Sequence, residues 1–313
     1  MESGAVPAAA PDAPGAASAL DPADWRAREA AHTARADALT AAVRERRARG
    51  EAHPVEDFLH TYYAWAPGRL RRWHPGAGVE LLGAAERAGW AHYRATARGA
   101  AVDTAALAAQ RGRTVRWARA VLDGARGRPA QLGCFGLHEW AMVHRASPEE
   151  VRHAGLPLRL GHAGTDEVVE THRVRCSHYD AFRFFTPSAV PRNELRPTRE
   201  SQPELEQPGC LHASMDLYKW AVKLSPAVPG ELLLDCYALA RDVRVLDMRA
   251  SPYDVSGLGL EPVRVETPQG KAEYARAQRG FAERAAPLRA ALVGACDVLL
   301  AASPPGGDGG DGA

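Results

Sequence analysis

Three short segments between residues 134 and 216 each combine a cysteine, a histidine and a carboxylate. In each segment a histidine follows the cysteine within four residues, and a carboxylate comes soon afterwards. Side chains of these types transfer protons, attack carbon as nucleophiles or bind metal ions. The segments therefore predict a reaction centre, and their chemically active residues are Cys134, His138 and Glu139; Cys176, His178 and Asp180; and Cys210, His212 and Asp216.

Metal binding is one chemistry that these residues permit. Three cysteines and three histidines are more than a tetrahedral zinc site needs, and three protein ligands with one water would generate hydroxide near neutral pH. The spacings, Cys-x3-His once and Cys-x-His twice, match none of the familiar paired zinc signatures. In the alternative interpretation the cysteines are small buried hydrophobic residues and the histidines form hydrogen bonds in the core. We therefore predict no resident metal or cofactor, with bound zinc as the alternative.

Four carboxylates of this region lie beside apolar or aromatic residues rather than in a run of charges. A buried carboxylate must be paired with a cation or have a raised pKa, and the second case gives a general base near pH 7. The competing role for each is an ion pair with a nearby arginine. These candidate bases are Glu139, Glu170, Asp180 and Asp216.

One candidate patch depends on a predicted helix that begins near Leu211. His212 and Asp216 are four residues apart, so on a helix they share a face, and Lys219 and Trp220 follow one turn later. The patch would combine a base, an orienting partner, a cation and a stacking ring. In the alternative interpretation, His212 and Asp216 simply pair with each other.

A second polar group, in the first third of the chain, is basic and aromatic. Arginines can contact phosphates while aromatic rings stack on exposed bases. The same residues can equally close a core beneath a Pro-Gly turn, and Arg192 and Asn193 from a later proline-rich loop can reach the same ligand. This group comprises Tyr62, Tyr63, Trp65, Arg69, Arg71, Arg72, Trp73 and His74.

The composition, 46% hydrophobic and 25% charged over 313 residues, predicts a soluble globular protein with a sizeable core. We expect residues 1–20 and 301–313, which are rich in alanine, proline and glycine, to be disordered tails around one domain at 21–300. No apolar run approaches the roughly 20 residues of a membrane helix. The five cysteines are widely spaced and odd in number, so we expect reduced thiols in a cytoplasmic protein.

The periodicity of apolar residues and the positions of glycine, proline and helix-capping residues predict a mainly helical α+β fold with a small antiparallel sheet. The region from 186 to 209 contains five prolines and is expected to be a long loop. The expected helices lie at 21–50, 58–65, 103–122, 211–224, 229–248 and 271–300, and the expected strands lie at 79–82 paired with 90–94, at 166–175 paired with 180–185 across a turn at Cys176, and at 262–266.

Five segments of the chain also carry a resemblance to a known family. They are residues 133–142 (GCFGLHEWAM), 176–187 (CSHYDAFRFFTP), 206–212 (EQPGCLH), 215–220 (MDLYKW) and 251–254 (SPYD). In these segments the chain resembles an actinobacterial family commonly named 3-methyladenine DNA glycosylase, over roughly residues 21 to 295. The resemblance implies a hydrolase that removes alkylated bases from double-stranded DNA in base-excision repair.

That activity requires the damaged nucleotide to be flipped into a pocket, where electron-rich rings can bind a cationic purine. A carboxylate would then orient water toward the sugar carbon or stabilise its developing positive charge. The hypothesis assigns Glu170 or Asp216 as the base and His212 or His178 as the orienting partner, with Glu139 as a further catalytic candidate. The expected binding residues are Trp140, Tyr179, Asp180, Tyr218 and Trp220 around the base and Arg69, Arg71, Arg72, Arg192 and Asn193 on the DNA.

The chain departs from the two familiar types of alkylpurine glycosylase. It has no helix-hairpin-helix turn of the form Leu-Pro-Gly-x-Gly, because residues 228–231 lack the second glycine. Glu170-Thr171 and Pro191-Arg192-Asn193 only partly match the Glu-Thr-Glu-Ala and Pro-Arg-Asn stretches of the other type. Two alternatives therefore stay open: a metal-dependent hydrolase or lyase of a small molecule, and a non-catalytic nucleic-acid-binding protein. Phosphate-loop, Rossmann and Gly-x-Ser-x-Gly motifs do not occur.

Overall fold

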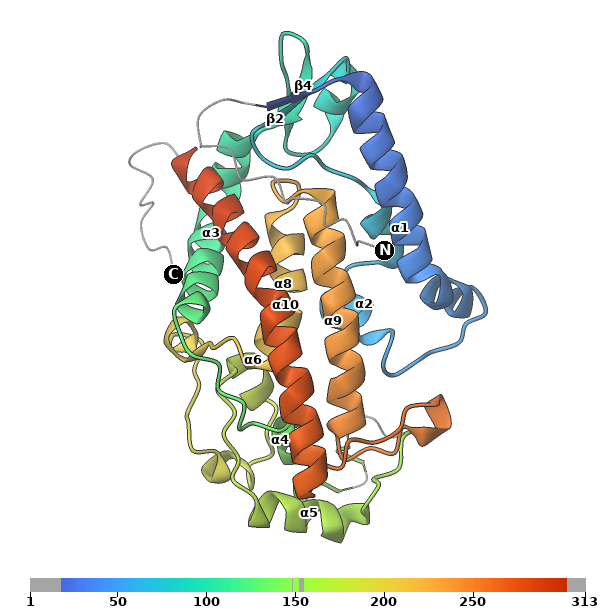
Figure 1. The fold of residues 1–313 in the computed structure, drawn as a ribbon, viewed down its shortest axis with the longest axis vertical. Coiled ribbons are helices and arrows are strands. Elements are labelled where there is room, and N and C mark those ends of the chain that lie inside the picture. The colour runs from blue at the N-terminus through green and yellow to red at the C-terminus, as the bar shows by residue number, and fades with distance from the viewer. Residues whose placement is uncertain (1–17, 148, 152–154, 303–313) are drawn as a thin grey trace, which may run out of the picture.

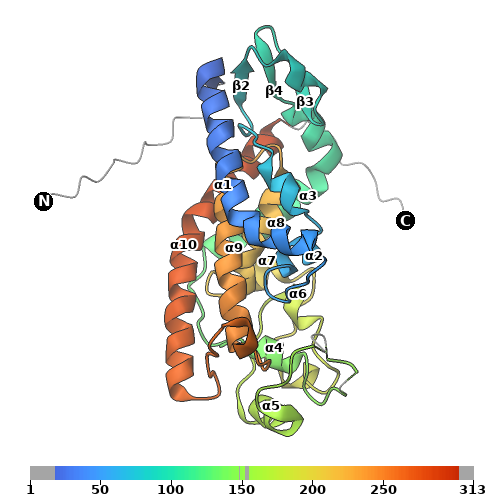
Figure 2. The same ribbon diagram turned by 90° about the vertical axis from the view of Figure 1, so that its right-hand side faces the viewer.

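The computed structural model describes residues 18–147, 149–151 and 155–302, which form a mainly helical fold with a small four-stranded sheet (Figure 1). The sheet lies at one end of the molecule, and the short helices α4 (Leu137–Ala141) and α5 (Gly161–Thr171) lie at the other. Long helices connect the two ends (Figure 2). This arrangement confirms the predicted fold class.

Four long helices form the central bundle: α3 (Thr104–Arg126), α8 (Leu211–Leu224), α9 (Gly230–Ala250) and α10 (Pro268–Ala301). Most residues of α8 are buried, because it lies between α9 and α10. Helix α10 packs along α3, α8 and α9, and Thr267 caps it by accepting a hydrogen bond from the Gly270 amide at 3.1 Å. These helices confirm the predictions made from apolar periodicity.

Helix α1 (Pro22–Ala48) begins where the sequence predicts. Asp21 caps it by accepting hydrogen bonds from the amides of Ala23 and Asp24 at 2.8 and 3.0 Å, and Pro22 occupies the first turn. The predicted helix near residue 58 is the short α2 (Phe58–Tyr62), which is followed by the 3-10 turn η1 (Pro67–Arg71). The loop after α2 therefore turns back toward α1.

The sheet has the strand order β1-β2-β4-β3 and is mixed rather than antiparallel. Strand β1 (Ser18–Leu20) pairs in parallel with β2 (Val79–Leu82), so three residues of the expected N-terminal tail are ordered. Strand β4 (Gly99–Val102) pairs antiparallel with both β2 and β3 (Tyr93–Ala95). The expected hairpin of 79–82 with 90–94 is wrong, because β4 lies between them.

The strands predicted at 166–175 and 180–185 are also wrong. The first region is largely α5, and the second begins in the one-turn helix α6 (Tyr179–Phe182). In α5 the buried side chains are Thr165, Val168 and Val169, which share one helical face, so β-branched composition concealed a helical period. Residues 262–266 form no strand either, although Val263 and Val265 are buried.

The remaining elements are short. The loop at 186–209 contains the 3-10 turn η3 (Val190–Arg192) and α7 (Gln202–Leu205), and η2 (Ala85–Gly89) and η4 (Ser256–Leu258) lie in other connections. All five cysteines are free thiols. None of the described helices combines the length and apolarity needed to span a bilayer. The expected tails at 1–17 and 303–313 lie outside the described residues, whereas α10 continues to Ala301.

Candidate functional site

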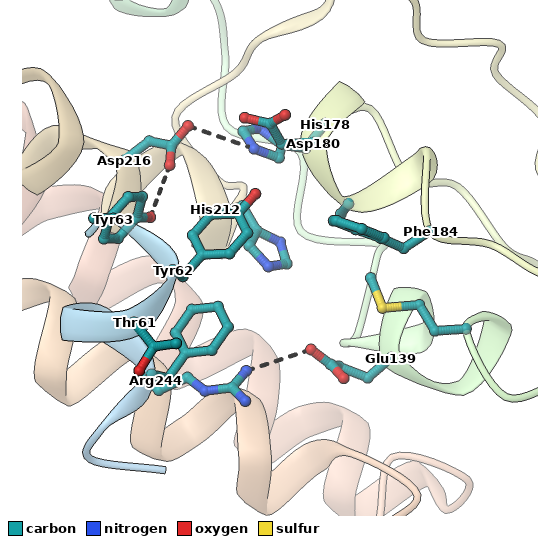
Figure 3. A pocket seen from close by; sticks show the side chains of 13 residues that line it. Thr61, Tyr62, Tyr63, Glu139, His178, Asp180, Phe184, His212, Asp216 and Arg244 are labelled. Atoms are coloured by element: carbon teal, nitrogen blue, oxygen red, sulfur yellow. Dashed lines mark hydrogen bonds and ion pairs between the residues drawn. The ribbon is translucent and has the colours of Figure 1, made fainter. Parts of the chain in front are cut away.

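A cavity of about 220 Å³ lies where α2, α4, α6, α8 and α9 meet (Figure 3). We call it the acidic cavity, because three carboxylates line it against one arginine. In Figure 3 the polar side chains of the cavity form two groups. Asp216 lies with His178 and Tyr63 on one side, and Glu139 lies with Arg244 on the other. The aromatic side chains that line it are Phe58, Tyr62, Tyr63 and Phe184, and the ionisable ones are Glu139, His178, Asp180, His212, Asp216 and Arg244.

The three cysteine-histidine-acid segments converge on this cavity. His138 is on α4, His178 precedes the first residue of α6, and His212 is in the first turn of α8. The ring of His212 lies between the other two, with centroids 4.4 Å from His138 and 5.2 Å from His178. Segments more than thirty residues apart in sequence thus place three imidazoles in contact, as the sequence predicts.

His138 is held from both sides. Its Nε2 lies 3.0 Å from the Asp247 carboxylate and its Nδ1 lies 3.6 Å from the Cys134 thiol. Burial alone would lower the pKa of His138, but the hydrogen bonds to Asp247 and Cys134 outweigh it and raise that pKa well above 6.5. Arg244 donates to the other oxygen of Asp247 at 2.8 Å, so this buried carboxylate is paired twice.

His178 is held by two carboxylates. Its Nδ1 lies 3.0 Å from Glu206 and its Nε2 lies 3.6 Å from Asp216. Burial works to lower the pKa of His178, yet Glu206 and then Asp216 raise it above its usual value. Glu206 also accepts a hydrogen bond from Gln202 at 3.0 Å, which fixes the carboxylate that orients the imidazole.

Asp216 is the carboxylate with the most partners on the cavity. Tyr63 donates its hydroxyl hydrogen to Asp216 at 2.8 Å, and Lys219 pairs with it from the next turn of α8. Lys219 also reaches Asp180 at 3.2 Å. Burial would lower the pKa of Lys219, but Asp216 and Asp180 raise it, so the ammonium stays charged between them.

His212 differs from its two neighbours because no carboxylate contacts it directly. Its buried Nδ1 has no hydrogen-bond partner among the described residues. Burial and then the neighbouring His138 lower the pKa of His212 well below 6.5. The side chain lines the cavity, so a neutral imidazole faces any ligand that enters it.

Three sets of side chains place potential metal-ligating atoms within 4.8 Å of one another. The sets built around His178 are engaged internally, because Lys219 occupies the space between Asp180 and Asp216, and Glu206 binds His178 and Gln202. The third set has the richest donor chemistry, two imidazoles and two carboxylates. It consists of His138, Glu139, His212 and Asp247.

Glu170, one of the two candidate bases, lies away from this cavity. It is on α5 and accepts hydrogen bonds or ion pairs from His144 at 3.3 Å, Arg145 at 2.5 Å and Arg192 at 3.4 Å. These hydrogen bonds lower the pKa of Glu170, with Arg145 contributing most. This placement corrects the expectation that Glu170 belongs to the same reaction centre as Asp216. Arg192, which was expected to contact DNA, is an ion-pair partner of Glu170.

The rings expected around a bound base are not the rings that line the cavity. Trp140 is fully buried and donates its indole hydrogen to the Ala250 carbonyl at 2.8 Å. Tyr218 is buried behind Tyr63, and Trp220 lines a different cavity with Lys223. Tyr179 is half-buried and does not line the acidic cavity. Trp140 and Tyr218 are therefore core residues.

The expected DNA contacts also separate. Arg71 pairs with Asp37 of α1 at 3.1 Å, whereas Arg69 and Arg72 line another cavity. Asn193 is buried and structural, since its side chain accepts from the Cys176 amide at 2.7 Å and donates to the Cys176 carbonyl at 2.9 Å. These residues do not form one surface around the acidic cavity.

Sequence reasoning missed two residues of the site on α9, Arg244 and Asp247. Together with Tyr237 and Ala240 they lie three or four residues apart, on the buried and mostly apolar face of this helix. Charged residues at such positions must be paired, so helical periodicity offered a signal for them. Phe184 gave no comparable signal, whereas Tyr62 and Tyr63 belong to the basic and aromatic group that the sequence indicated.

No family model, curated protein or solved structure matches the chain.

Proposed function

We propose that the protein is an enzyme whose reaction centre is the acidic cavity, and that it cleaves the glycosidic bond of an alkylated purine in DNA. The observation that carries the first half is the convergence of three cysteine-histidine-acid segments on one cavity with aromatic walls. The proposal that the substrate is an alkylated purine in DNA follows from the family resemblance of the sequence. Perturbed ionisable groups gathered in a cleft are typical of catalytic sites.

Substrate binding would use the aromatic walls and the three carboxylates that line the cavity. An alkylated purine is flat and cationic, and the aromatic rings of Tyr62 and Phe184 could contact a cationic ring. Phe58 is already engaged, because it stacks on Tyr62 at 5.1 Å and Arg244 lies over its ring at 4.0 Å. Glu139, Asp180 and Asp216 would attract the charge, while a cavity of about 220 Å³ suits a single ring system better than a larger ligand. These features support a small, positively charged group as the part of the substrate that enters.

Asp216 is the carboxylate best placed to act on the substrate. It lines the cavity and is fixed by Tyr63, Lys219 and His178. An ionised carboxylate in this position can stabilise positive charge that develops on the sugar carbon, or it can orient the attacking water. His212 lines the cavity as a neutral imidazole and could form a hydrogen bond with that water.

Contact with DNA would fall to arginines near the cavity rather than to Arg69 or Arg72. Arg183 is half-exposed, lies 4.1 Å from the ring centre of Phe184 and pairs with Asp180 at 3.2 Å. Its guanidinium therefore lies next to the aromatic wall. A small-molecule substrate would need no such contact, so the size of the substrate is the point that requires an experiment.

The test is incubation of the purified protein with methylated duplex DNA and, separately, with 3-methyladenine deoxynucleoside, followed by chromatographic measurement of the free base. We expect release from the duplex at a rate well above spontaneous depurination. Release from the nucleoside alone would restrict the activity to a small-molecule hydrolase. No release from either substrate would contradict the glycosylase proposal.

A metal-dependent hydrolase is the second candidate, and one observation favours it. His138 Nε2 and Asp247 Oδ1 lie 3.0 Å apart, and Glu139 and His212 complete the set. Two ligands of a tetrahedral ion, each about 2.1 Å from it, lie about 3.4 Å from each other, which is close to that separation. Arg244, which pairs with Asp247 and Glu139, is the competing cation.

Elemental analysis separates the two candidates. A metal enzyme would retain close to one equivalent of a divalent ion after dialysis, and the double variant His138→Ala/His212→Ala would lose it. The matched control is His162→Gln, which changes an exposed histidine on α5. A metal-free protein that still releases the base would exclude the second candidate.

A further inference from the structure

We propose that a second cavity, at the opposite end of α8, binds the phosphoryl group of an anionic ligand. Its volume is about 410 Å³, and Ser225, at the end of α8, lies on its wall together with Arg69, Arg72, His74 and His92. We call it the arginine cavity. It is distinct from the acidic cavity, because the two cavities share no lining residue. The inference does not depend on the proposed glycosylase activity.

The two arginines of this cavity have no carboxylate partner among the described residues. Arg69 lies over the ring of Trp65 at 5.2 Å, and Arg72 lies over the ring of Trp90 at 5.0 Å. Both side chains are exposed, and no carboxylate is among the residues that line the cavity in the described part of the chain. Stacking on tryptophan restricts each guanidinium while its hydrogen-bond donors stay available.

Arg71 shows that this arrangement is not a general property of the segment. It lies between Arg69 and Arg72 in sequence, yet it pairs with Asp37 of α1 at 3.1 Å. The same short stretch therefore contains one neutralised arginine and two that are not neutralised. Guanidinium groups that line one cavity without a carboxylate partner among the described residues are suited to a dianionic oxygen ligand, which planar donor forks can bind in a bidentate manner.

A third arginine, Arg111, binds the backbone of the cavity wall at Ser225. Arg111 of α3 donates to the carbonyls of Lys223 and Ser225 at 2.9 and 3.1 Å, and it lies 3.3 Å from His92 Nε2. Its charge adds to the positive potential at Ser225. Asp103 is a carboxylate that acts electrostatically on His92, and it caps α3 by accepting a hydrogen bond from the Ala106 amide at 2.9 Å.

The backbone of His92 adopts an unusual conformation. His92 has a φ of 63°, a left-handed conformation that is sterically unfavourable for a residue other than glycine. Its carbonyl accepts a hydrogen bond from the Asp103 amide at 2.8 Å, which holds this conformation. Strained residues of this kind cluster at ligand sites, and here the strain places an imidazole on the wall of the cavity.

Two sources could supply such a group, a small phosphorylated molecule or the backbone of a nucleic acid. Titration calorimetry at low ionic strength with inorganic phosphate, adenosine monophosphate and a duplex oligonucleotide separates them. We expect saturable phosphate binding that is weakened about tenfold or more in Arg69→Ala/Arg72→Ala. If the oligonucleotide loses affinity in parallel, the source is a nucleic-acid backbone, and if it does not, the source is a small ligand.

Arg71→Ala is the matched control, because it removes one arginine from the same turn without touching the cavity. We expect it to bind phosphate within about twofold of the wild type, since it breaks only an exposed ion pair. Equal binding by the double variant and the wild type would overturn the proposal, and so would an equal loss in Arg71→Ala. The imidazole resonances of His92 give a second readout that survives any change in stability: they should shift on adding phosphate to the wild type.

Discussion

The acidic cavity and the arginine cavity lie toward opposite ends of α8 and treat charge in opposite ways. Around the acidic cavity each buried carboxylate contacts a cation or a histidine, as Asp216 contacts Lys219 and Asp247 contacts Arg244. Around the arginine cavity, Arg69 and Arg72 are exposed and lie over tryptophan rings, with no carboxylate partner in the part of the chain that the structure describes. One region has completed its interactions within the protein, whereas the other has cationic groups that a ligand can satisfy.

The difference follows from the cost of burying charge. Removing an ion from water costs several kcal/mol unless a partner compensates for it, so the ionic groups near His138 and His178 must be paired for the core to fold. An exposed guanidinium costs little and can stay unpaired. The ion pairs around the acidic cavity fix the geometry needed for catalysis. The arginines of the other cavity keep their hydrogen-bond donors available for an anion.

The largest effect on stability should come from breaking the buried network of the acidic cavity. Asp247→Ala leaves Arg244 and His138 without their carboxylate partner, so we expect a loss of about 3–5 kcal/mol in the free energy of unfolding, measured with urea. Asp242→Ala breaks an ion pair that is half-exposed on both sides and should change stability by less than about 0.5 kcal/mol. Equal effects of the two substitutions would remove the basis of the comparison.

A smaller effect is expected from the hydroxyl that positions Asp216. Tyr63→Phe removes one hydrogen bond to a charged carboxylate and keeps the ring, so the rate of base release should fall about tenfold with KM nearly unchanged. Tyr179→Phe is the control, because that half-buried ring does not line the cavity. A change in KM with an unchanged rate would indicate that Tyr63 contacts the substrate instead.

The third effect concerns pH and the arginine cavity. Burial, followed by Arg72 and Arg87, lowers the pKa of His74 to about 3. The unfolded chain protonates this residue near 6.5, so its contribution to stability is complete above pH 6.5 and is lost as pH falls toward 3. Between pH 6.5 and 5, His74→Gln should therefore lose about 1–2 kcal/mol less stability than the wild type.

Urea unfolding at the two pH values measures this difference. His162→Gln, which removes an exposed histidine, should follow the wild type. A parallel pH dependence of His74→Gln and wild type would show that His74 is protonated in the folded protein and that the arginines do not repel its proton.

Much of the helical framework could be predicted from the sequence. The long helices have apolar faces and clear boundary signals, such as Asp21 and Pro22 before α1. The strand predictions at 166–175 and 180–185 failed because local β propensity conflicted with tertiary packing, which buries Val168 and Val169 on one side of a helix. The parallel pairing of β1 with β2 joins residues about sixty positions apart, and no local pattern encodes it.

The candidate site was predicted in part. The spacing of cysteine, histidine and acid identified His138, His178 and His212, and the structure brings their rings together. The sequence did not show that Glu170 and Trp140 lie outside the lining of the acidic cavity. A single sequence does not reveal which side chains contact each other after folding. Phe184 became part of the wall only through tertiary contact.

The most direct test of the central claim, that the acidic cavity is the reaction centre, is a single-turnover rate of 3-methyladenine release from methylated duplex DNA. The variants to compare are Asp216→Asn, inside the cavity, and Glu170→Gln, on α5 outside it. Loss of a positioned acid or base lowers rates by about 10²–10⁴-fold, and we predict this loss for Asp216→Asn with Glu170→Gln close to wild type. The reverse order, or equal losses, would contradict the account.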